Sequence, residues 1–297
     1  MNLYVQKFAA LQKGKIEEFF TQKCAAFESL QYAYFKAKLS NCNAVFYESG
    51  KFVIQGKDIE NLVAEFEKFM GISSANSEDK ETSQETTAAD YPCYIGTDES
   101  GKGDYFGSLV VAGVMVDESN KEDFIKLGIK DSKKLNDTTI KKFAAHIKNN
   151  SIFSIVTINP EKYNELYGKF NNLNKLLAWG HARAIENILL KKKCEYALSD
   201  QFGDESLIKN ALAKEGRKIT LEQRHRAESD IAVACASVIA RAEYVIRMEN
   251  MQKKYNFEFS KGASDLVVAQ AKNFCKQFGK EELNKVAKLH FKTTKLL

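Results

Sequence analysis

The sequence predicts a two-domain chain, in which a small α+β domain precedes a larger α/β domain with a mixed sheet and flanking helices. Residues 71–90 contain almost no large apolar side chain, so they cannot bury enough surface to offset the entropy lost on ordering. The segment before them combines helical stretches with a hairpin, and the segment after them begins with three strand-like runs followed by strands and long helices. We therefore expect one domain at residues 1–70, a linker at 71–90 and a second domain at 91–297.

The first domain is expected to be a helix-and-sheet layer that binds a partner. Residues 2–39 show helical periodicity, and apolar side chains return at helical spacing in residues 57–70. Between them, "NAVFYESGKFVIQG" contains two strand-like runs around Ser49 and Gly50, which form a good hairpin turn because glycine tolerates positive φ. This domain contains no paired carboxylates beside glycines and no evident pair of nucleophile and base, which favours binding over chemistry.

The second domain is expected to contain strands and helices in mixed order. Its strand candidates are short, β-rich runs at residues 91–99, 107–116, 151–160, 195–202 and 218–225. Leucines and alanines at helical spacing predict a helix over residues 172–192, with Asn171 to Asn174 as candidate caps. An alanine-rich stretch predicts a second long helix over residues 229–255, for which Ser229 is the expected N-cap.

The composition excludes some classes of protein. No stretch approaches the roughly eighteen apolar residues that a membrane span requires, and the N-terminus lacks a signal-peptide core, so we expect a cytoplasmic protein. Six cysteines are scattered without a C-x-x-C pair, which favours reduced thiols over disulfides or a metal site. The net charge of +5 fits a polyanionic partner, but many cytosolic enzymes carry a similar excess of base. The lysine-rich stretches at residues 131–142, 189–193 and 285–297 are each consistent with a solvated surface.

Residues 94–107, "YIGTDESGKGDYFG", allow two interpretations, and the first is a phosphate-binding loop. Gly96, Gly101 and Lys102 have the G-x-x-x-x-G-K spacing of such a loop. However, Gly103 stands where a hydroxyl would ligate magnesium, and the intervening residues include carboxylates that would face the phosphate. The following residues have a strand pattern, whereas a phosphate loop opens a helix. We therefore reject the phosphate loop.

The second interpretation is an acidic site for divalent metal ions. Asp98 and Glu99 are neighbours in a strand and point to opposite faces unless the strand ends or distorts, and Ser100 with Gly101 supplies such a break. A two-metal phosphodiester site needs further oxygen ligands from separate elements. The candidates are Asp200 at the end of a strand, and Glu228 or Asp230 at the start of a helix. A simpler role for Asp230 is to pair with the dipole of that helix.

Several motifs resemble, in order, those of type 2 ribonucleases H. They are "GTDESGKGDYFG", "DSKKL", "SDQF" and "AESDIAVACASVIAR". The stretch "YNELYGKFNNLNKLLAWGHARAI" is similar to one typical of the ribonuclease HIII branch, and the "SGKFVIQG" hairpin resembles part of that branch's additional TATA-binding-protein-like domain. Ser108 replaces the proline of the family's "FGP", which changes the rigidity of a turn rather than a ligand.

The resemblance implies a fold and an activity. The second domain would have a ribonuclease H-like fold, and the first would be TATA-binding-protein-like and would grip the substrate. The chain would be a monomeric endoribonuclease that cleaves the RNA strand of RNA–DNA hybrids. It would use two Mg²⁺ or Mn²⁺ ions and leave 5′-phosphate and 3′-hydroxyl ends.

The resemblance also implies roles for individual residues. The metal-binding catalytic residues would be Asp98, Glu99, Asp200 and Glu228. Glu228 is favoured because the ribonuclease HIII branch has glutamate as its fourth acid, and Asp230 is the alternative. The substrate-binding residues would be Gly101, Lys102, Gly103, Ser132 and Lys133. His181 is interpreted as packing or hydrogen bonding, because a metal-activated water does not require a histidine base.

Overall fold

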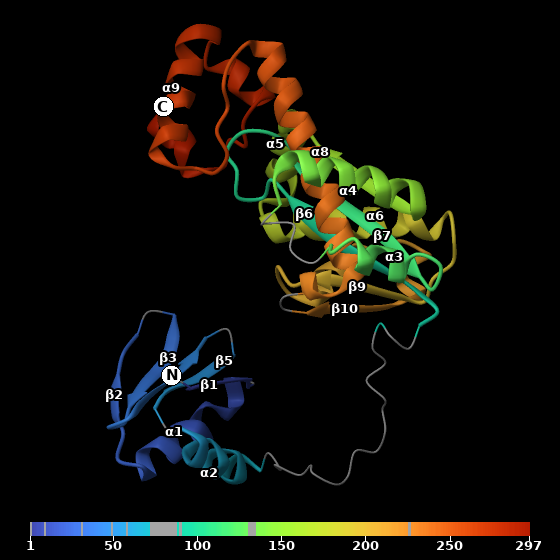
Figure 1. Cartoon of the computed structure of the whole chain (residues 1–297). Helices are drawn as coiled ribbons and strands as arrows, with labels where there is room; N and C mark the ends of the chain where they lie inside the picture. Colours follow the sequence, from blue (N-terminus) through green and yellow to red (C-terminus); the bar gives the residue numbers. More distant parts are fainter. Residues whose placement is uncertain are drawn as a thin grey trace. The chain divides into compact units, whose positions relative to one another are not determined.

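The structure is a computed structural model in which the chain divides into two compact units, Met1–Glu85 and Thr86–Leu297 (Figure 1). The residues that it describes are 2–8, 10–30, 32–48, 50–57, 59–71, 88, 91–129, 135–224 and 227–297. Most of the expected linker, residues 72–87 and 89–90, lies outside them. Each unit has a hydrophobic core of its own.

The first unit is a five-stranded antiparallel sheet with helices packed on one face (Figure 1). The strand order is β1 (Asn2–Lys7), β5 (Lys51–Gly56), β4 (Cys42–Tyr47), β3 (Ala33–Lys38) and β2 (Ala26–Glu28). The helices are α1 (Lys13–Gln22), which follows the short 3-10 helix η1 (Ala10–Gln12), and α2 (Glu60–Met70). Phe20 of α1 and Phe66 of α2 pack on Phe52 of the sheet, so the core lies between the helices and the sheet.

The hairpin and the second helix of this unit are confirmed, whereas the helix expected over residues 2–39 is largely wrong. β4 and β5 flank Gly50, which has a φ of +81°, although Ser49 lies outside the described residues. Among the described residues between 2 and 39, only Lys13–Gln22 form an α-helix. β1 pairs with β5 along its whole length, and β3 pairs with β4. These hydrogen bonds to distant strands outweigh the local helical periodicity.

The second unit is built on a five-stranded mixed sheet (Figure 1). The strand order is β10 (Thr220–Arg224), β9 (Tyr196–Asp200), β6 (Cys93–Ser100), β7 (Leu109–Asp117) and β8 (Phe153–Ile158). β6, β7 and β8 pair in antiparallel fashion, and β9 runs parallel to both β6 and β10. The five strands predicted for this domain are confirmed, with ends that differ by a few residues.

Helices surround this sheet. The α-helices are α3 (Lys121–Lys126), α4 (Asp137–Asn150), α5 (Pro160–Phe170), α6 (Leu173–Leu189), α7 (Glu205–Ala211), α8 (Ile231–Tyr255) and α9 (Asp265–Phe278). The 3-10 helices are η4 (Gly216–Lys218), η5 (Ala227–Ser229), η6 (Glu281–Lys285) and η7 (Lys292–Leu296). Both long helices predicted from periodicity are confirmed as α6 and α8, and Asn172 caps α6 by accepting a hydrogen bond from the amide of Lys175.

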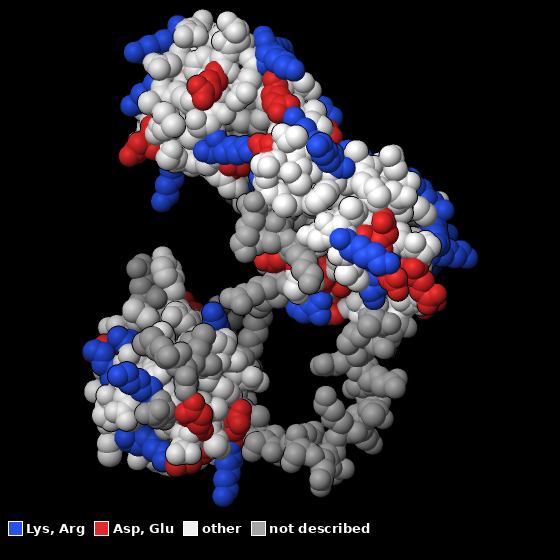
Figure 2. Space-filling view, in the orientation of Figure 1, with Lys and Arg blue, Asp and Glu red and all other residues white. Residues whose placement is uncertain are grey.

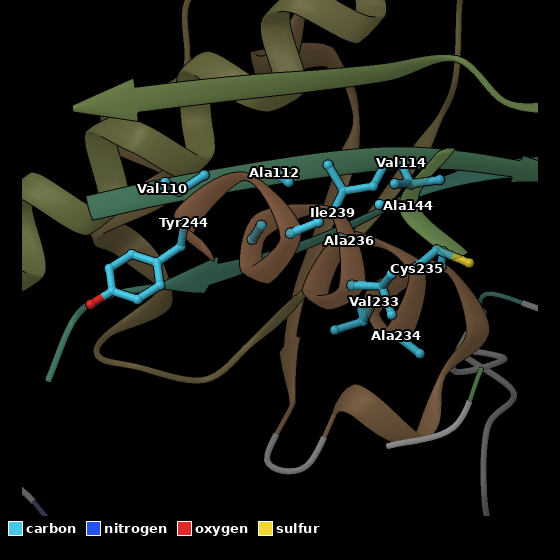
Figure 3. Close-up of a cluster of buried hydrophobic side chains, with 14 of the residues drawn as sticks. Val110, Ala112, Val114, Ala144, Val233, Ala234, Cys235, Ala236, Ile239 and Tyr244 are labelled. Atoms are coloured by element: carbon cyan, nitrogen blue, oxygen red, sulfur yellow. The ribbon is translucent and has the colours of Figure 1, made fainter. Parts of the chain in front are cut away.

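α6 and α8 cover opposite faces of the sheet. Side chains alternate along β7, so that successive residues pack against one helix and then the other. Val110, Ala112 and Val114 point toward Ala236 and Ile239 of α8 (Figure 3). The intervening residues Val111 and Gly113 face α6. The chemistry-bearing strand β6 is therefore buried between two layers of helix.

Small residues let α8 lie close to β6. A Cβ atom at Gly96 would stand 2.2 Å from the backbone carbon of Ala232, so no larger side chain fits there without moving the helix. The close contact at Gly96 places the first turn of α8 over β6 at a point two residues before Asp98 in the sequence. The glycine that suggested a phosphate loop thus serves helix–sheet packing.

The structure adds two observations to the expectations from composition. No helix in the ranges that the structure describes is long and apolar enough to cross a membrane. The cysteines are free thiols, of which Cys42, Cys194 and Cys235 are buried, Cys93 and Cys275 are half-buried and Cys24 is exposed.

Candidate active site

The parallel pairing of β6 and β9 places Asp98 and Asp200 at neighbouring strand ends, whereas Glu99, the next residue of β6, points to the α6 face of the sheet. Thr97 lies opposite Ser199 in the register, so Asp98 and Asp200 are the next residues at the carboxyl ends of the two strands. Burial raises the pKa of Asp98 well above its ordinary range, and the charges of Glu99 and Asp200 raise it further. A hydrogen bond with Ser237 of α8 opposes this rise. The negative charges of Glu99 and Asp200 therefore lie close enough to Asp98 to disfavour its ionisation.

Glu99 is held by two partners. Its Oε2 lies 3.2 Å from Nε2 of His181, and its Oε1 accepts a 3.2 Å hydrogen bond from Nζ of Lys102. Burial pushes the pKa of Glu99 upward, but the hydrogen bond and charge of His181 and the charge of Lys102 outweigh it, so the pKa falls below its usual value. Glu99 is therefore more readily ionised than Asp98.

Glu228 is carried to the strand end by the 3-10 helix η5. The amide of Ala227, the first residue of η5, donates a 3.1 Å hydrogen bond to Oδ1 of Asp200. Glu228 follows directly and is half-buried. The structure thus places the backbone of Glu228 next to Asp200.

Asp230 caps a helix. Its Oδ1 accepts hydrogen bonds from the amides of Ala232 at 2.8 Å and Val233 at 3.4 Å, and its Oδ2 accepts one from the hydroxyl of Tyr94 at 3.0 Å. Ser229, which the sequence favoured as the cap, is instead the last residue of η5. That expectation was wrong because η5 inserts a tighter turn before the helix and moves the cap one residue along.

The loop after β9 contains an acid that the sequence analysis overlooked. The ring of Phe202 stacks on His181 at 4.9 Å, and Nζ of Lys102 lies 5.7 Å from the centre of the same ring. This loop therefore folds back against both partners of Glu99. Asp204, two residues further on, is exposed and accepts a hydrogen bond from the amide of Ser206. The sequence feature that could have pointed to Asp204 is its position four residues after Asp200.

The predicted substrate-binding residues are only partly described. Gly101 has a φ of +85°, and a Cβ atom there would stand 2.3 Å from the carbonyl oxygen of Ser108, so glycine is required. Gly103 has open space where a side chain would lie. Ser132 and Lys133 lie outside the described residues.

A buried lysine pins the loop that follows these glycines. Nζ of Lys288, which is fully buried, donates 2.8 Å hydrogen bonds to the carbonyl oxygens of Asp104 and Gly107. The amide of Lys288 donates to the carbonyl of Tyr105, and the amide of Gly107 donates to that of Val286. The C-terminal segment thus fixes the backbone of residues 104–107 on both sides.

Lys288 should make stability depend on pH. Burial lowers the pKa of its ammonium group to about 7, against the opposing charge of Asp104, while an unfolded lysine keeps its ordinary value of 10.5. Between these values the unfolded chain binds a proton that the folded chain has released. The free energy of unfolding should therefore rise with pH, by at most about 1.4 kcal/mol per pH unit.

This expectation is checked by urea unfolding between about pH 7 and pH 8.5, and comparison with a Lys288 variant cancels the ionisation of thiols, whose ordinary pKa of about 8.5 lies at the top of this range. Lys288→Met, which keeps the unbranched shape, should flatten the rise although it leaves two carbonyl oxygens unpaired. Parallel profiles for the wild type and the variant would contradict the assignment.

The chemistry of the cluster suits a divalent cation. As they stand, the described residues contain no group of three or more His, Cys, Asp or Glu side chains close enough to hold a metal ion. The acidic side chains at these strand ends nevertheless offer carboxylate oxygens, the ligands that Mg²⁺ and Mn²⁺ prefer. Their mutual repulsion is what a divalent cation between them would relieve. A mixed sheet with acids at the carboxyl ends of two central strands matches what one class of protein requires, the metal-dependent phosphodiester hydrolases.

Comparisons with known proteins agree with this class. The family model for Ribonuclease HII matches residues 95–294, and that for a domain of unknown function (DUF3378) matches residues 5–80. Ribonuclease HIII of Protochlamydia amoebophila (strain UWE25) is 42% identical over 262 residues, which cover 88% of this chain and 85% of that protein. Ribonuclease HIII of Chlamydia felis (strain Fe/C-56) is 38% identical over 294 residues, which cover 98% and 95%. The crystal structure of Bst-RNase HIII in complex with Mn²⁺ has a TM-score of 0.66 at 29% identity and covers 99% of this chain and 97% of that chain.

The chain therefore belongs to the ribonuclease HII family, in its ribonuclease HIII branch. It is a metal-dependent ribonuclease H, an endonuclease that cleaves the RNA strand of RNA–DNA hybrids. The family resemblance, the fold and the activity expected from the sequence are confirmed.

Proposed function

We propose that Asp98, Glu99, Asp200 and Glu228 together hold two Mg²⁺ or Mn²⁺ ions at the carboxyl ends of β6 and β9. When bound, such ions activate the attacking water and stabilise the departing 3′ oxygen, so that the products carry 5′-phosphate and 3′-hydroxyl ends. The observation that supports this proposal is the register of β6 and β9, which sets Asp98 and Asp200 at neighbouring strand ends with Glu99 next in the chain. Burial, and then the charges of Glu99 and Asp200, raise the pKa of Asp98. The Mn²⁺ bound to Bst-RNase HIII supports the choice of metal.

The loop after β6 is proposed to read the ribose. Gly101 and Gly103 follow directly after the acids, and glycine lets backbone groups approach a substrate closely. A 2′-hydroxyl bound there distinguishes RNA from DNA. Lys102 would supply a positive charge near the scissile phosphate, and Ser132 and Lys133 are proposed as further contacts with the backbone.

The first unit is proposed to grip the hybrid duplex through the sheet face opposite its helices. Val53 pairs with Val45, and Gln55 pairs with Asn43, which places an apolar row beside a row of amides on this face. Lys36 lies opposite Val45 in the register, so a cation stands at the end of the apolar row. Such a face combines surface for sugars with donors for phosphates and groove edges, which suits recognition by shape.

A hollow lies at one end of this face. It measures about 660 Å³ and is lined by Asn41, Asn43, Gln55 and Lys57, among others. On the visible face of both units, basic and acidic side chains are interspersed, so charge alone marks no path for the duplex on that face (Figure 2). We therefore assign the grip to this sheet face and not to the overall excess of base.

We further propose that the chain acts in the cytoplasm as a monomer. A single copy contains all the acids of the proposed site and both units, so the proposed chemistry requires no second subunit. Light scattering of the purified protein should give a mass near 33.5 kDa, and a mass of twice that value would refute the monomer.

The identity of the fourth acid is tested by three substitutions. Glu228→Gln should lower the rate of hybrid cleavage by at least about 100-fold and raise the metal concentration needed for half-maximal rate, because it removes a ligand charge. Asp230→Asn should stay close to the wild type, since asparagine caps a helix as well as aspartate. Steady-state cleavage of a labelled RNA–DNA hybrid across a Mn²⁺ series measures both quantities.

Asp204→Asn completes the comparison. If Asp204→Asn removes activity while Glu228→Gln retains it, the fourth ligand comes from the loop after β9 and our assignment is wrong. Loss of activity in Asp230→Asn, with folding intact, would instead restore the alternative that the sequence left open.

A further inference from the structure

His181 is a fully buried imidazole in a helix whose buried side chains are mostly apolar. It comes near the acids because α6 lies close to the sheet at this point: a Cβ atom at Gly180 would stand 2.8 Å from Cγ2 of Val111. A buried imidazole needs hydrogen-bond partners for both ring nitrogens, or its burial is costly. Both of its nitrogens have partners, and these belong to the two strands that carry the acids.

The partners determine which nitrogen of His181 carries the proton. Nε2 lies 3.2 Å from Oε2 of Glu99, and an ionised carboxylate can only accept, so Nε2–H is the donor. Nδ1 then accepts, and Oγ1 of Thr97 lies 2.9 Å from it. The hydroxyl of Ser199 on β9 is a weaker second neighbour of Nδ1 at 3.4 Å. The Thr97 hydroxyl donates to Nδ1 in this tautomer, so it supports the ring orientation that holds Glu99.

The ring of His181 is also fixed from the side. Phe202 stacks on it with the ring planes 28° apart, which limits rotation of the imidazole. The other oxygen of Glu99 is bound by Lys102, so each carboxylate oxygen has a partner. A ligand oriented before the ion arrives loses less freedom on binding, and partners of this kind typically change metal affinity by about 10- to 100-fold.

We propose that His181 is a positioning residue of the active site, which through Nε2–H holds the Glu99 carboxylate in its metal-binding orientation. This inference rests on the proposed metal role of Glu99. It assigns His181 no contact with the substrate and no proton transfer, and it depends on the orientation of the ring alone.

The test measures Mn²⁺ binding to the full-length protein by calorimetry without substrate, and hybrid cleavage over a Mn²⁺ series. His181→Phe keeps a stacking ring but removes the donor, and it should weaken Mn²⁺ binding by about 10- to 100-fold and raise the half-saturating Mn²⁺ by a similar factor. His181→Gln, whose amide can reach toward Glu99, should recover part of the affinity. His146→Gln, at an exposed histidine that pairs with Asp123, is the matched control and should bind Mn²⁺ as the wild type does.

The outcomes separate this inference from the proposed site. Wild-type Mn²⁺ binding by a folded His181→Phe overturns the inference. Wild-type binding and cleavage by Glu99→Gln overturns instead the metal role of Glu99. If His181→Phe does not fold, Thr97→Val decides, because it removes the hydroxyl that donates to Nδ1 and preserves the shape: weaker Mn²⁺ binding supports the inference, and unchanged binding rejects it.

Discussion

Asp98→Asn is expected to abolish hybrid cleavage, with a loss of at least about 1,000-fold, while the variant still folds and still binds the hybrid. Asn keeps the shape of the side chain but removes the charge that a divalent cation requires. Because burial and the charges of Glu99 and Asp200 disfavour an ionised Asp98, the free energy of unfolding should stay the same or rise. Cleavage assays, filter binding and urea unfolding measure the three quantities.

Asp117→Asn is the matched control for this substitution. Asp117 ends β7 and lies opposite Cys93, the first residue of β6, so it sits at the other end of the same strand pair. Its partners are Lys192 and Ser119, neither of which belongs to the proposed site. Asp117→Asn should cleave at the wild-type rate. If Asp98→Asn also does so, the metal site is not at the carboxyl ends of β6 and β9.

Deletion of residues 1–90 is expected to weaken hybrid binding by about 10-fold or more, because a second binding module joined by a short linker acts at millimolar effective concentration. The turnover rate at saturating substrate should change far less, since the acids all belong to the second unit. That unit has a core of its own, so it should fold without the first. The measurement is the KM and kcat of the truncated protein against those of the full chain.

Two controls accompany this deletion. Circular dichroism and urea unfolding should show that residues 91–297 fold cooperatively. Adding the separate first unit at micromolar concentration should not restore the affinity, because the covalent link supplies the effective concentration. Equal affinity for the truncated and full-length proteins would refute the substrate-gripping role of the first unit.

Local patterns predicted much of the second unit correctly. Short, β-rich runs located β6, β7, β8, β9 and β10, and helical spacing located α6 and α8. These elements satisfy local propensity and tertiary packing together, so a single sequence reveals them. β1 shows the opposite case: "NLYVQK" pairs with β5, some fifty residues away, and that pairing was not visible in the local period.

The candidate site likewise combines residues that a local motif predicts with contacts that only the packing of separate elements creates. Asp98, Glu99 and Asp200 were predicted as metal ligands because each stands in a short motif at the end of a strand, and this role stays a prediction. The bond between His181 and Glu99 spans 82 positions, and the bond between Lys288 and Gly107 spans 181 positions. No pattern within one segment encodes such contacts, because they exist only when separate elements pack.

The sequence by itself determined the family and most of the elements that carry the predicted acids, because these depend on residues close together in the chain. The tertiary structure alone decided that Asp230 and not Ser229 caps α8, that Asn2–Lys7 is a strand, and that Thr97 and Phe202 set the orientation of His181. Each of these outcomes depends on hydrogen bonds or packing between groups that meet only after the chain has folded, and a local pattern contains no information about those partners.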